Sequence, residues 1–247
     1  MSAKSASFDS PWRFWPGVAI LAAAMTGYML LSWAHMEFVR QTVGLDAYLG
    51  EGPRLPPEVL MIGQINKAVA VLAAIAIGAL ALHRVGPSRV GLVAVSGRWI
   101  WLAVLVGAVA FALRLVLAKL MVVVMPDWIA FMGTPFALDP GNGVWMSVGF
   151  LVMTILVTPF AEEVFFRGFL FRWMSGNRPV WLAALVSSVM FGVAHILPPQ
   201  AISAALMALI LCWLYWRTGS IWPAIAAHVT NNALGIGLGL VLAGGQV

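Results

Sequence analysis

Two adjacent glutamates and an arginine interrupt AEEVFFRGFL, Ala161 to Leu170, a stretch so apolar that it is expected inside a membrane. A charged side chain at the centre of a membrane helix costs about 2.5–3.5 kcal/mol, so these carboxylates should face a protein interior or a wet cavity. Glu163 and Arg167 are four residues apart and share a helix face, which predicts an intrahelical salt bridge. Glu162 is rotated by about 100° and is expected to point elsewhere, free to act on something else.

Further polar residues that could work with these glutamates occur in two later apolar segments. His195 lies in FGVAHIL, and His228 and Asn232 lie in AAHVTNN. Because His228 and Asn232 are also four residues apart, they present two hydrogen-bonding groups from one helix face. Asn231 is the alternative to Asn232, but the spacing of four favours Asn232.

Helix geometry allows these side chains to meet. The turn SGNRP, residues 175–179, should join two antiparallel helices, with Glu163 about 18 Å before it and His195 about 24 Å after it along the axis. In the last helix, His228 lies about 9 Å and Asn232 about 15 Å from the helix start. If the hairpin projects a turn or two beyond the membrane, all four residues share one depth.

The composition indicates an integral membrane protein. Of 247 residues, 62% are hydrophobic and only 9% are charged, far from the roughly 25% charged residues of soluble domains. The net charge of +5 comes from basic residues in loops, so orientation in a bilayer explains it better than nucleic-acid binding. The single cysteine, Cys212, rules out an internal disulfide.

Seven segments are predicted to be membrane-spanning helices, because each approaches the roughly 20 apolar residues that a bilayer requires. The predicted fold is therefore an all-α polytopic bundle of about seven transmembrane helices. Residues 1–16 are expected to form a cytoplasmic tail, 17–140 the N-terminal helices and loops, and 141–247 the functional core. The predicted spans are 17–35, 66–83, 99–125, 144–171, 180–197, 200–217 and 222–243.

The distribution of charged loop residues predicts a cytoplasmic N-terminus and an external C-terminus. Cytoplasmic loops carry an excess of lysine and arginine. With the N-terminus inside, one side holds Lys4, Arg13, Arg84, Arg89, Arg98, Arg172, Arg178 and Arg217. The other side then holds Glu37, Asp46, Glu51, Glu58, Asp127 and Asp139, with Arg40 and Arg54. Tryptophans near the span ends, Trp12 and Trp15 among them, are expected to anchor the helices at the membrane interface.

Three short patterns occur in order: Glu-Glu-x-x-x-Arg at 162–167, Phe-x-x-x-His at 191–195 and His-x-x-x-Asn at 228–232. Together they resemble the CAAX protease and bacteriocin-processing family of intramembrane proteases, which includes the type II CAAX prenyl endopeptidases. The resemblance covers roughly residues 144–235. It implies an endopeptidase whose site lies inside the bilayer and opens to the cytoplasm.

The resemblance also implies a role for each matching residue. Glu162 and His195 would activate the attacking water, and His228 and Asn232 would stabilise the oxyanion, while Glu163 and Arg167 would support the site. These residue types suit amide hydrolysis, which needs a base for the water and hydrogen-bond donors where negative charge develops.

A zinc mechanism is the alternative use of the same residues. Two histidines and a glutamate, here His195, His228 and Glu162, can hold a catalytic zinc with water in the fourth position. The sequence lacks His-Glu-x-x-His, and Asn232 suits an oxyanion better than zinc. A mechanism without a metal or other cofactor is therefore favoured, with zinc as the alternative.

Three functions remain in competition at this stage. An intramembrane peptidase uses the whole polar set. A non-proteolytic scaffold or bacteriocin-immunity protein of the same fold would not require it. A transporter or proton relay could use buried glutamate and histidine, but no two related halves are evident. The expected partners are membrane lipids and a membrane-anchored peptide or protein substrate, with no nucleic acid, and the expected location is a bacterial plasma membrane.

Other polar residues have simpler interpretations. The glutamates could form a structural ion pair with Arg167 and Arg172, and either histidine could bond a backbone carbonyl. Lys119 is expected to extend outward along its helix. Arg114 lies deeper and could pair inside the bundle or touch the site.

Overall fold

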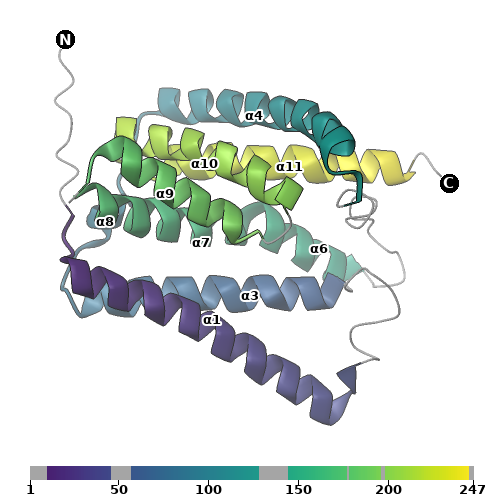
Figure 1. Cartoon of the computed structure of the whole chain (residues 1–247), viewed down its shortest axis with the longest axis horizontal. Coiled ribbons are helices and arrows are strands. Elements are labelled where there is room, and N and C mark those ends of the chain that lie inside the picture. Colours follow the sequence, from purple (N-terminus) through teal and green to yellow (C-terminus); the bar gives the residue numbers. More distant parts are fainter. Residues whose placement is uncertain (1–9, 46–56, 128–143, 177, 196–197, 245–247) are drawn as a thin grey trace.

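A computed structural model describes residues 10–45, 57–127, 144–176, 178–195 and 198–244. Within these ranges every regular element is a helix (Figure 1). The predicted all-helical membrane bundle is therefore confirmed. Several residues used to predict the orientation lie outside the described ranges, namely Lys4, Asp46, Glu51, Arg54 and Asp139, as does the side chain of Glu58. The orientation and the division into three regions stay predictions.

Seven helical rods make up the described chain. The first three are α1 (Phe14–Thr42), α3 (Pro57–Ala73) with its π-helical continuation η1 (Ala74–Ala81), and α4 (Gly97–Val124). A short 3₁₀ turn, η2 (Pro87–Val90), precedes α4. The fourth rod is continuous and consists of α6 (Val144–Val152), η4 (Met153–Val157), α7 (Thr158–Glu163), η5 (Val164–Phe171) and α8 (Arg172–Ser175). The last three are α9 (Val180–Val193), α10 (Pro198–Thr218) and α11 (Trp222–Gly244).

Six of the described helices are long and apolar enough to cross a membrane, and α9 is shorter. The predicted fifth span, 180–197, is therefore too long, because α9 has 14 residues and ends at Val193. At about 1.5 Å per residue, α9 covers about 21 Å of a hydrocarbon core roughly 30 Å thick. His195 consequently lies in the turn that follows α9, where its backbone N–H donates to the Gly192 carbonyl at 2.9 Å.

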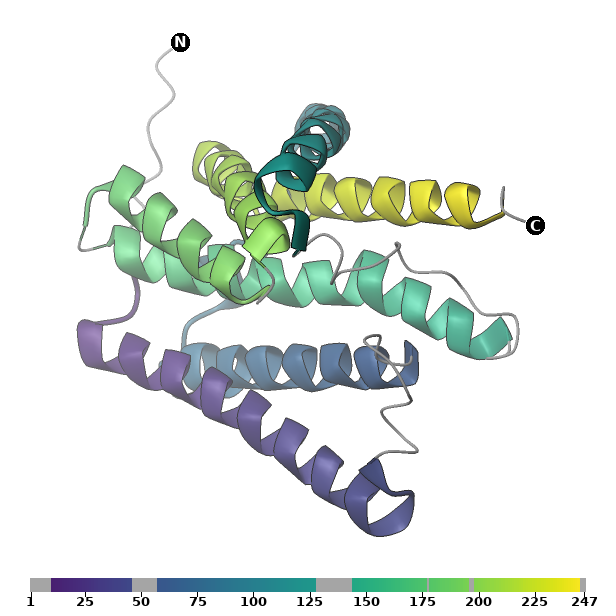
Figure 2. The same cartoon turned by 45° about the vertical axis from the view of Figure 1, so that its right-hand side comes forward.

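The rod from α6 to α8 runs through the middle of the bundle. The helices α1 and α3 pack together on one side of it, and α4 packs with α10 and α11 on the other (Figures 1 and 2). The segment α7 contacts both α3 and α11. The glutamates of α7 therefore lie between helices from the two halves of the chain.

Small residues bring α4 close to α11. Ala103, Gly107 and Ala110 form the buried stripe of α4, whereas large side chains such as Leu105 and Val109 are exposed toward the expected lipid. A Cβ at Gly107 would collide with the carbonyl oxygen of Ala227 in α11. Small side chains allow such close backbone approach between membrane helices, where lipid removes the hydrophobic drive for association.

An aromatic cluster closes the bundle around η5, and it corrects one prediction. Trp12, expected at the membrane interface, is only 2% exposed. Its indole N–H donates to the Ala79 carbonyl at 3.1 Å, and its ring meets Phe169 edge-on at 5.3 Å. Trp15, three residues later, is 74% exposed, as an interfacial anchor should be. Trp12 differs because its N–H finds an acceptor inside the bundle, which makes burial of an indole favourable.

Candidate active site

The two glutamates are the most buried acidic groups among the described residues. Glu163 is fully buried and Glu162 is 5% exposed. Both lie at the end of α7, between the π-helical segments η4 and η5. Single π-helical turns inside α-helices occur frequently at functional sites, because they change the direction in which neighbouring side chains point.

Arg167 neutralises Glu163. Its Nη1 donates to Glu163 Oε1 at 3.0 Å, which confirms the salt bridge expected from the spacing of four. Its Nη2 donates to the Ala208 carbonyl at 3.2 Å, and the guanidinium lies 4.6 Å from the centre of the Phe191 ring. The buried arginine is thus held by a carboxylate, a carbonyl and an aromatic face. A charge pair that is fully buried requires such additional partners.

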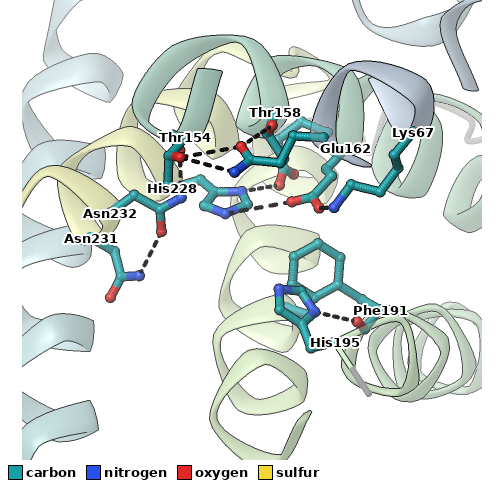
Figure 3. A network of polar contacts seen from close by, with 12 residues as sticks. Lys67, Thr154, Thr158, Glu162, Phe191, His195, His228, Asn231 and Asn232 are labelled. Atoms are coloured by element: carbon teal, nitrogen blue, oxygen red, sulfur yellow. Dashed lines mark hydrogen bonds and ion pairs between the residues drawn. The ribbon is translucent and has the colours of Figure 1, made fainter. Parts of the chain in front are cut away.

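His228 contacts both glutamates. Its Nδ1 lies 2.8 Å from Glu163 Oε1, and its Nε2 lies 3.8 Å from Glu162 Oε2 (Figure 3). A carboxylate only accepts hydrogen bonds, so Nδ1 carries a hydrogen and donates it to Glu163. The expectation that the two glutamates point in different directions is therefore only half correct, because both reach the same imidazole.

Lys67 is a site residue that the sequence analysis missed. It lies on α3, and its Nζ donates to Glu162 Oε1 at 2.5 Å (Figure 3). Glu162 is therefore paired, and not free as predicted. The predicted span 66–83 put Lys67 at its end, where a lysine is expected to reach the interface, whereas the helix begins at Pro57 and places Lys67 inside the span. The partner was also missing, because it lies 95 residues away in sequence.

Phe191 connects the remaining groups. Its carbonyl accepts a hydrogen bond from His195 Nδ1 at 2.8 Å, which leaves Nε2 of the neutral ring as the acceptor. The Phe191 ring lies 4.8 Å from the ring of His195 and 5.8 Å from that of His228. The bond to a backbone carbonyl that the simpler interpretation proposed for His195 is therefore present, and it orients the ring.

A chain of amides and hydroxyls extends the site along α11. Asn232 Nδ2 donates to the Thr154 carbonyl at 3.1 Å, and Asn232 Oδ1 accepts from Asn231 Nδ2 at 3.3 Å. Gln64 of α3 accepts from the hydroxyls of Thr154 and Thr158 at 3.2 and 3.0 Å. Both asparagines thus belong to the polar network, and Gln64, one turn from Lys67, is a second contribution of α3.

These side chains surround one cavity of about 860 Å³. Glu162, His195, His228 and Asn232 all line it, as their predicted depths require, together with Lys67. Glu163 and Arg167 do not line it and lie behind His228. The cavity continues between α4, α10 and α11, where its wall is mostly apolar. A volume of this size is within the range of ligand-binding cavities in proteins.

Of the other predicted polar residues, Arg114 lies at the cavity, and Lys119 and Arg172 lie away from it. Arg114 lines the cavity, whereas Lys119, five residues further along α4, is exposed as expected. Arg172 is not part of the glutamate pairing, and its Nη1 donates to the Tyr215 hydroxyl at 3.2 Å.

Zinc ligation by Glu162, His195 and His228 is the alternative use of these residues. Among the described residues, no group of three His, Cys, Asp or Glu side chains is placed to hold a metal ion. Glu162 Oε1 is already bound by the Lys67 ammonium, which places a positive charge where a cation would otherwise be needed. No catalytic step through a metal is therefore derived.

Comparison with known proteins finds a family model that matches the C-terminal part of the chain. Residues 144–234 match the model of the Rce1-like family, described as type II CAAX prenyl endopeptidase Rce1-like. The matched range agrees with the residues 144–235 over which the motifs indicated a resemblance.

Two proteins of Bacillus subtilis are similar to the chain. "Putative membrane peptidase YdiL" is 32% identical over 82 residues, which are 33% of this chain and 34% of that protein. "Uncharacterized protein YyaK" is 29% identical over 143 residues, which are 53% of this chain and 46% of that protein. The chain thus matches between a third and a half of the length of these relatives. No solved structure matches the chain.

Proposed function

Because residues 144–234 match the model of the type II CAAX prenyl endopeptidase Rce1-like family, we propose that this integral membrane protein is an intramembrane endopeptidase. Its substrates in this proposal are membrane-associated proteins or peptides. The observation that carries the proposal is the convergence of Glu162, His195, His228 and Asn232 on one cavity within the bundle. A structural ion pair alone would not require two histidines and an asparagine on the same cavity wall.

In the proposed reaction Glu162 and His195 activate water. The Oε2 of Glu162, 3.8 Å from His228 Nε2, and the Nε2 of His195 both accept hydrogen bonds, so either can take a proton from a water in the cavity. The resulting hydroxide attacks the carbonyl carbon of the scissile bond. The same proton is then given to the leaving amine, which completes the hydrolysis.

His228 and Asn232 stabilise the oxyanion in this mechanism. His228 donates through Nδ1 to Glu163, so it needs a second proton on Nε2 to serve the oxyanion and acts as an imidazolium in this role. The Asn232 amide carries a second N–H beside the one given to the Thr154 carbonyl. Glu163 acts only by positioning His228, and Arg167 acts only by balancing the charge of Glu163.

The proposed mechanism uses no metal. The Lys67 ammonium and the Arg167 guanidinium provide the positive charge that balances the two carboxylates. We further propose a bacterial plasma membrane as the location, with the N-terminus in the cytoplasm, on the basis of the loop charges.

Cleavage of a probe peptide tests this function. The protein is reconstituted in liposomes with a pool of internally quenched, N-acylated decapeptides, and fluorescence is followed for the unaltered chain and three variants. We expect Glu162→Gln to lower the rate by about 10²–10⁴-fold, as for loss of a general base. His195→Ala and His228→Ala should lower it by at least about 10²-fold.

Two controls make this experiment decisive. Glu37→Gln removes a carboxylate far from the cavity, from an exposed pair with Arg40, and should leave the rate unchanged. Addition of a strong chelator followed by zinc should also leave it unchanged. Full activity of a folded Glu162→Gln variant would overturn the assignment of the base, and loss on chelation with recovery in zinc would overturn the metal-free mechanism.

A further inference from the structure

Arg114 is a cation in the middle of α4, the most apolar of the described spans. Its guanidinium does not extend to the end of the helix. It lies 5.4 Å from the centre of the Phe111 ring and reaches across to α11 at Gly235. A Cβ at position 235 would lie 2.6 Å from Arg114 Nη2, so the absence of a side chain there makes room for the guanidinium. Both residues line the active-site cavity.

Arg114 has no carboxylate partner among the described residues. The two buried glutamates of α7 are already matched, Glu162 at the cavity by Lys67 and Glu163 behind it by Arg167. A guanidinium that remains charged inside a bundle without a counter-ion is expensive, and such residues mark the path of a substrate or ion. The cavity therefore offers one positive charge that the protein itself leaves unbalanced within the described ranges.

The position of this charge relative to the reaction centre is fixed by α11. Gly235 follows His228 by seven residues, which is two helical turns or about 10.5 Å along the axis. Asn231 and Asn232 line the cavity between these two levels, so the space is continuous. An extended peptide advances about 3.3–3.6 Å per residue, so about three residues cover the distance.

From these contacts we propose that Arg114 binds a carboxylate of the peptide substrate, about three residues from the bond that is cleaved. The guanidinium fork matches a carboxylate with two parallel hydrogen bonds. The carboxylate can be the C-terminus of the peptide or the side chain of an aspartate or glutamate, and both present the same chemistry. This inference rests on the proposed peptidase function and adds a residue that determines specificity.

Binding without turnover tests the proposal. The full-length Glu162→Gln protein in phosphatidylcholine nanodiscs is titrated into fluorescein-labelled decapeptides of mixed Ala, Leu, Ser and Gly, and anisotropy is measured. One pool ends in a free carboxylate, a second in a carboxamide, and a third in a carboxamide with a single glutamate at varied positions. We expect one or both anionic pools to bind about tenfold or more tightly than the neutral pool, as one charge-assisted contact provides. The anionic pool that shows the preference identifies the source of the carboxylate.

Variants of α4 assign the preference to Arg114. Arg114→Gln should abolish it, and Arg114→Lys should retain part of it because the charge remains. Lys119→Gln removes a cation from the same helix outside the cavity and should retain all of it. Equal binding of all pools, no binding of any pool, or a preference that survives Arg114→Gln would overturn the proposal.

Two further outcomes separate this inference from its alternatives. In a second measurement, phosphatidylglycerol is added and the shift in the unfolding temperature is recorded. If Arg114→Gln changes only this shift and leaves peptide binding unchanged, Arg114 binds a lipid phosphate and the peptide proposal is wrong. Because binding is measured without cleavage, a protein that selects carboxylate peptides but never cleaves them would contradict the proposed function and leave the role of Arg114 intact.

Discussion

Glu162 and Glu163 are neighbours in sequence and have opposite surroundings. The Glu163–Arg167 pair is local, four residues apart on one helix, and both side chains are fully buried. The Glu162–Lys67 pair joins α7 to α3, and the Lys67 side chain is 30% exposed. The Glu163 carboxylate is enclosed behind His228, and the Glu162 carboxylate lines the cavity.

This contrast shows how one helix can hold an enclosed and a cavity-facing carboxylate side by side. A rotation of about 100° between successive residues places Glu163 against Arg167 and behind His228, and Glu162 on the cavity. His228 links the two, because one of its nitrogens contacts each carboxylate. Glu163 is buried and held rigid by its partner, whereas Glu162 can contact a molecule in the cavity.

The largest expected effect within this comparison comes from breaking the enclosed pair. Arg167→Met removes the guanidinium and leaves Glu163 as an uncompensated buried charge. We expect the free energy of unfolding to fall by about 3–5 kcal/mol, the usual cost of breaking one side of a buried pair. Denaturant titration in detergent measures it. A change below about 1 kcal/mol would show that the site tolerates an unpaired Glu163.

A smaller effect is expected at the cavity pair, and it should appear in activity more than in stability. Lys67→Met leaves Glu162 without its ammonium, and an unpaired buried carboxylate tends to take up a proton. A protonated Glu162 cannot act as a base, so cleavage of the probe peptides should fall by about tenfold or more. Lys67→Arg, which keeps the charge, should retain more of the rate, and equal losses in both variants would contradict this account.

The smallest effect is expected at an exposed pair of the same chemistry. Arg40 Nη2 lies 2.6 Å from Glu37 Oε1 on α1, with both side chains partly or largely exposed. Solvent screens such a pair and the side chains lose entropy in forming it. Arg40→Met should therefore leave the unfolding midpoint within experimental error, measured beside Arg167→Met. A similar loss in both variants would mean that burial is not what distinguishes the pairs.

Much of the candidate site was accessible from local spacing. The Glu163–Arg167 pair follows from a separation of four residues, and the shared face of His228 and Asn232 follows from the same rule. The common depth of Glu162, His195 and His228 follows from counting residues from the turns. Each of these inferences uses only the rise and periodicity of a helix.

Contacts between distant helices were not accessible in this way. Gln64 lies before the predicted span 66–83 and Lys67 at its end, and the sequence does not say which helix they face. The burial of Trp12 depends on a carbonyl at Ala79, 67 residues away. The early end of α9, which places His195 in a turn, was hidden by the apolar residues that continue beyond it.

The sequence by itself determined that this chain forms a helical membrane protein, and which side chains share a face of each helix. These properties depend on composition and on a helical period that every residue obeys. Only the tertiary structure decided that Lys67 pairs with Glu162, that His228 contacts both glutamates, and that Arg114 reaches Gly235. The rotation and tilt of one helix against another are set by the packing of many side chains at once, and no single segment encodes them.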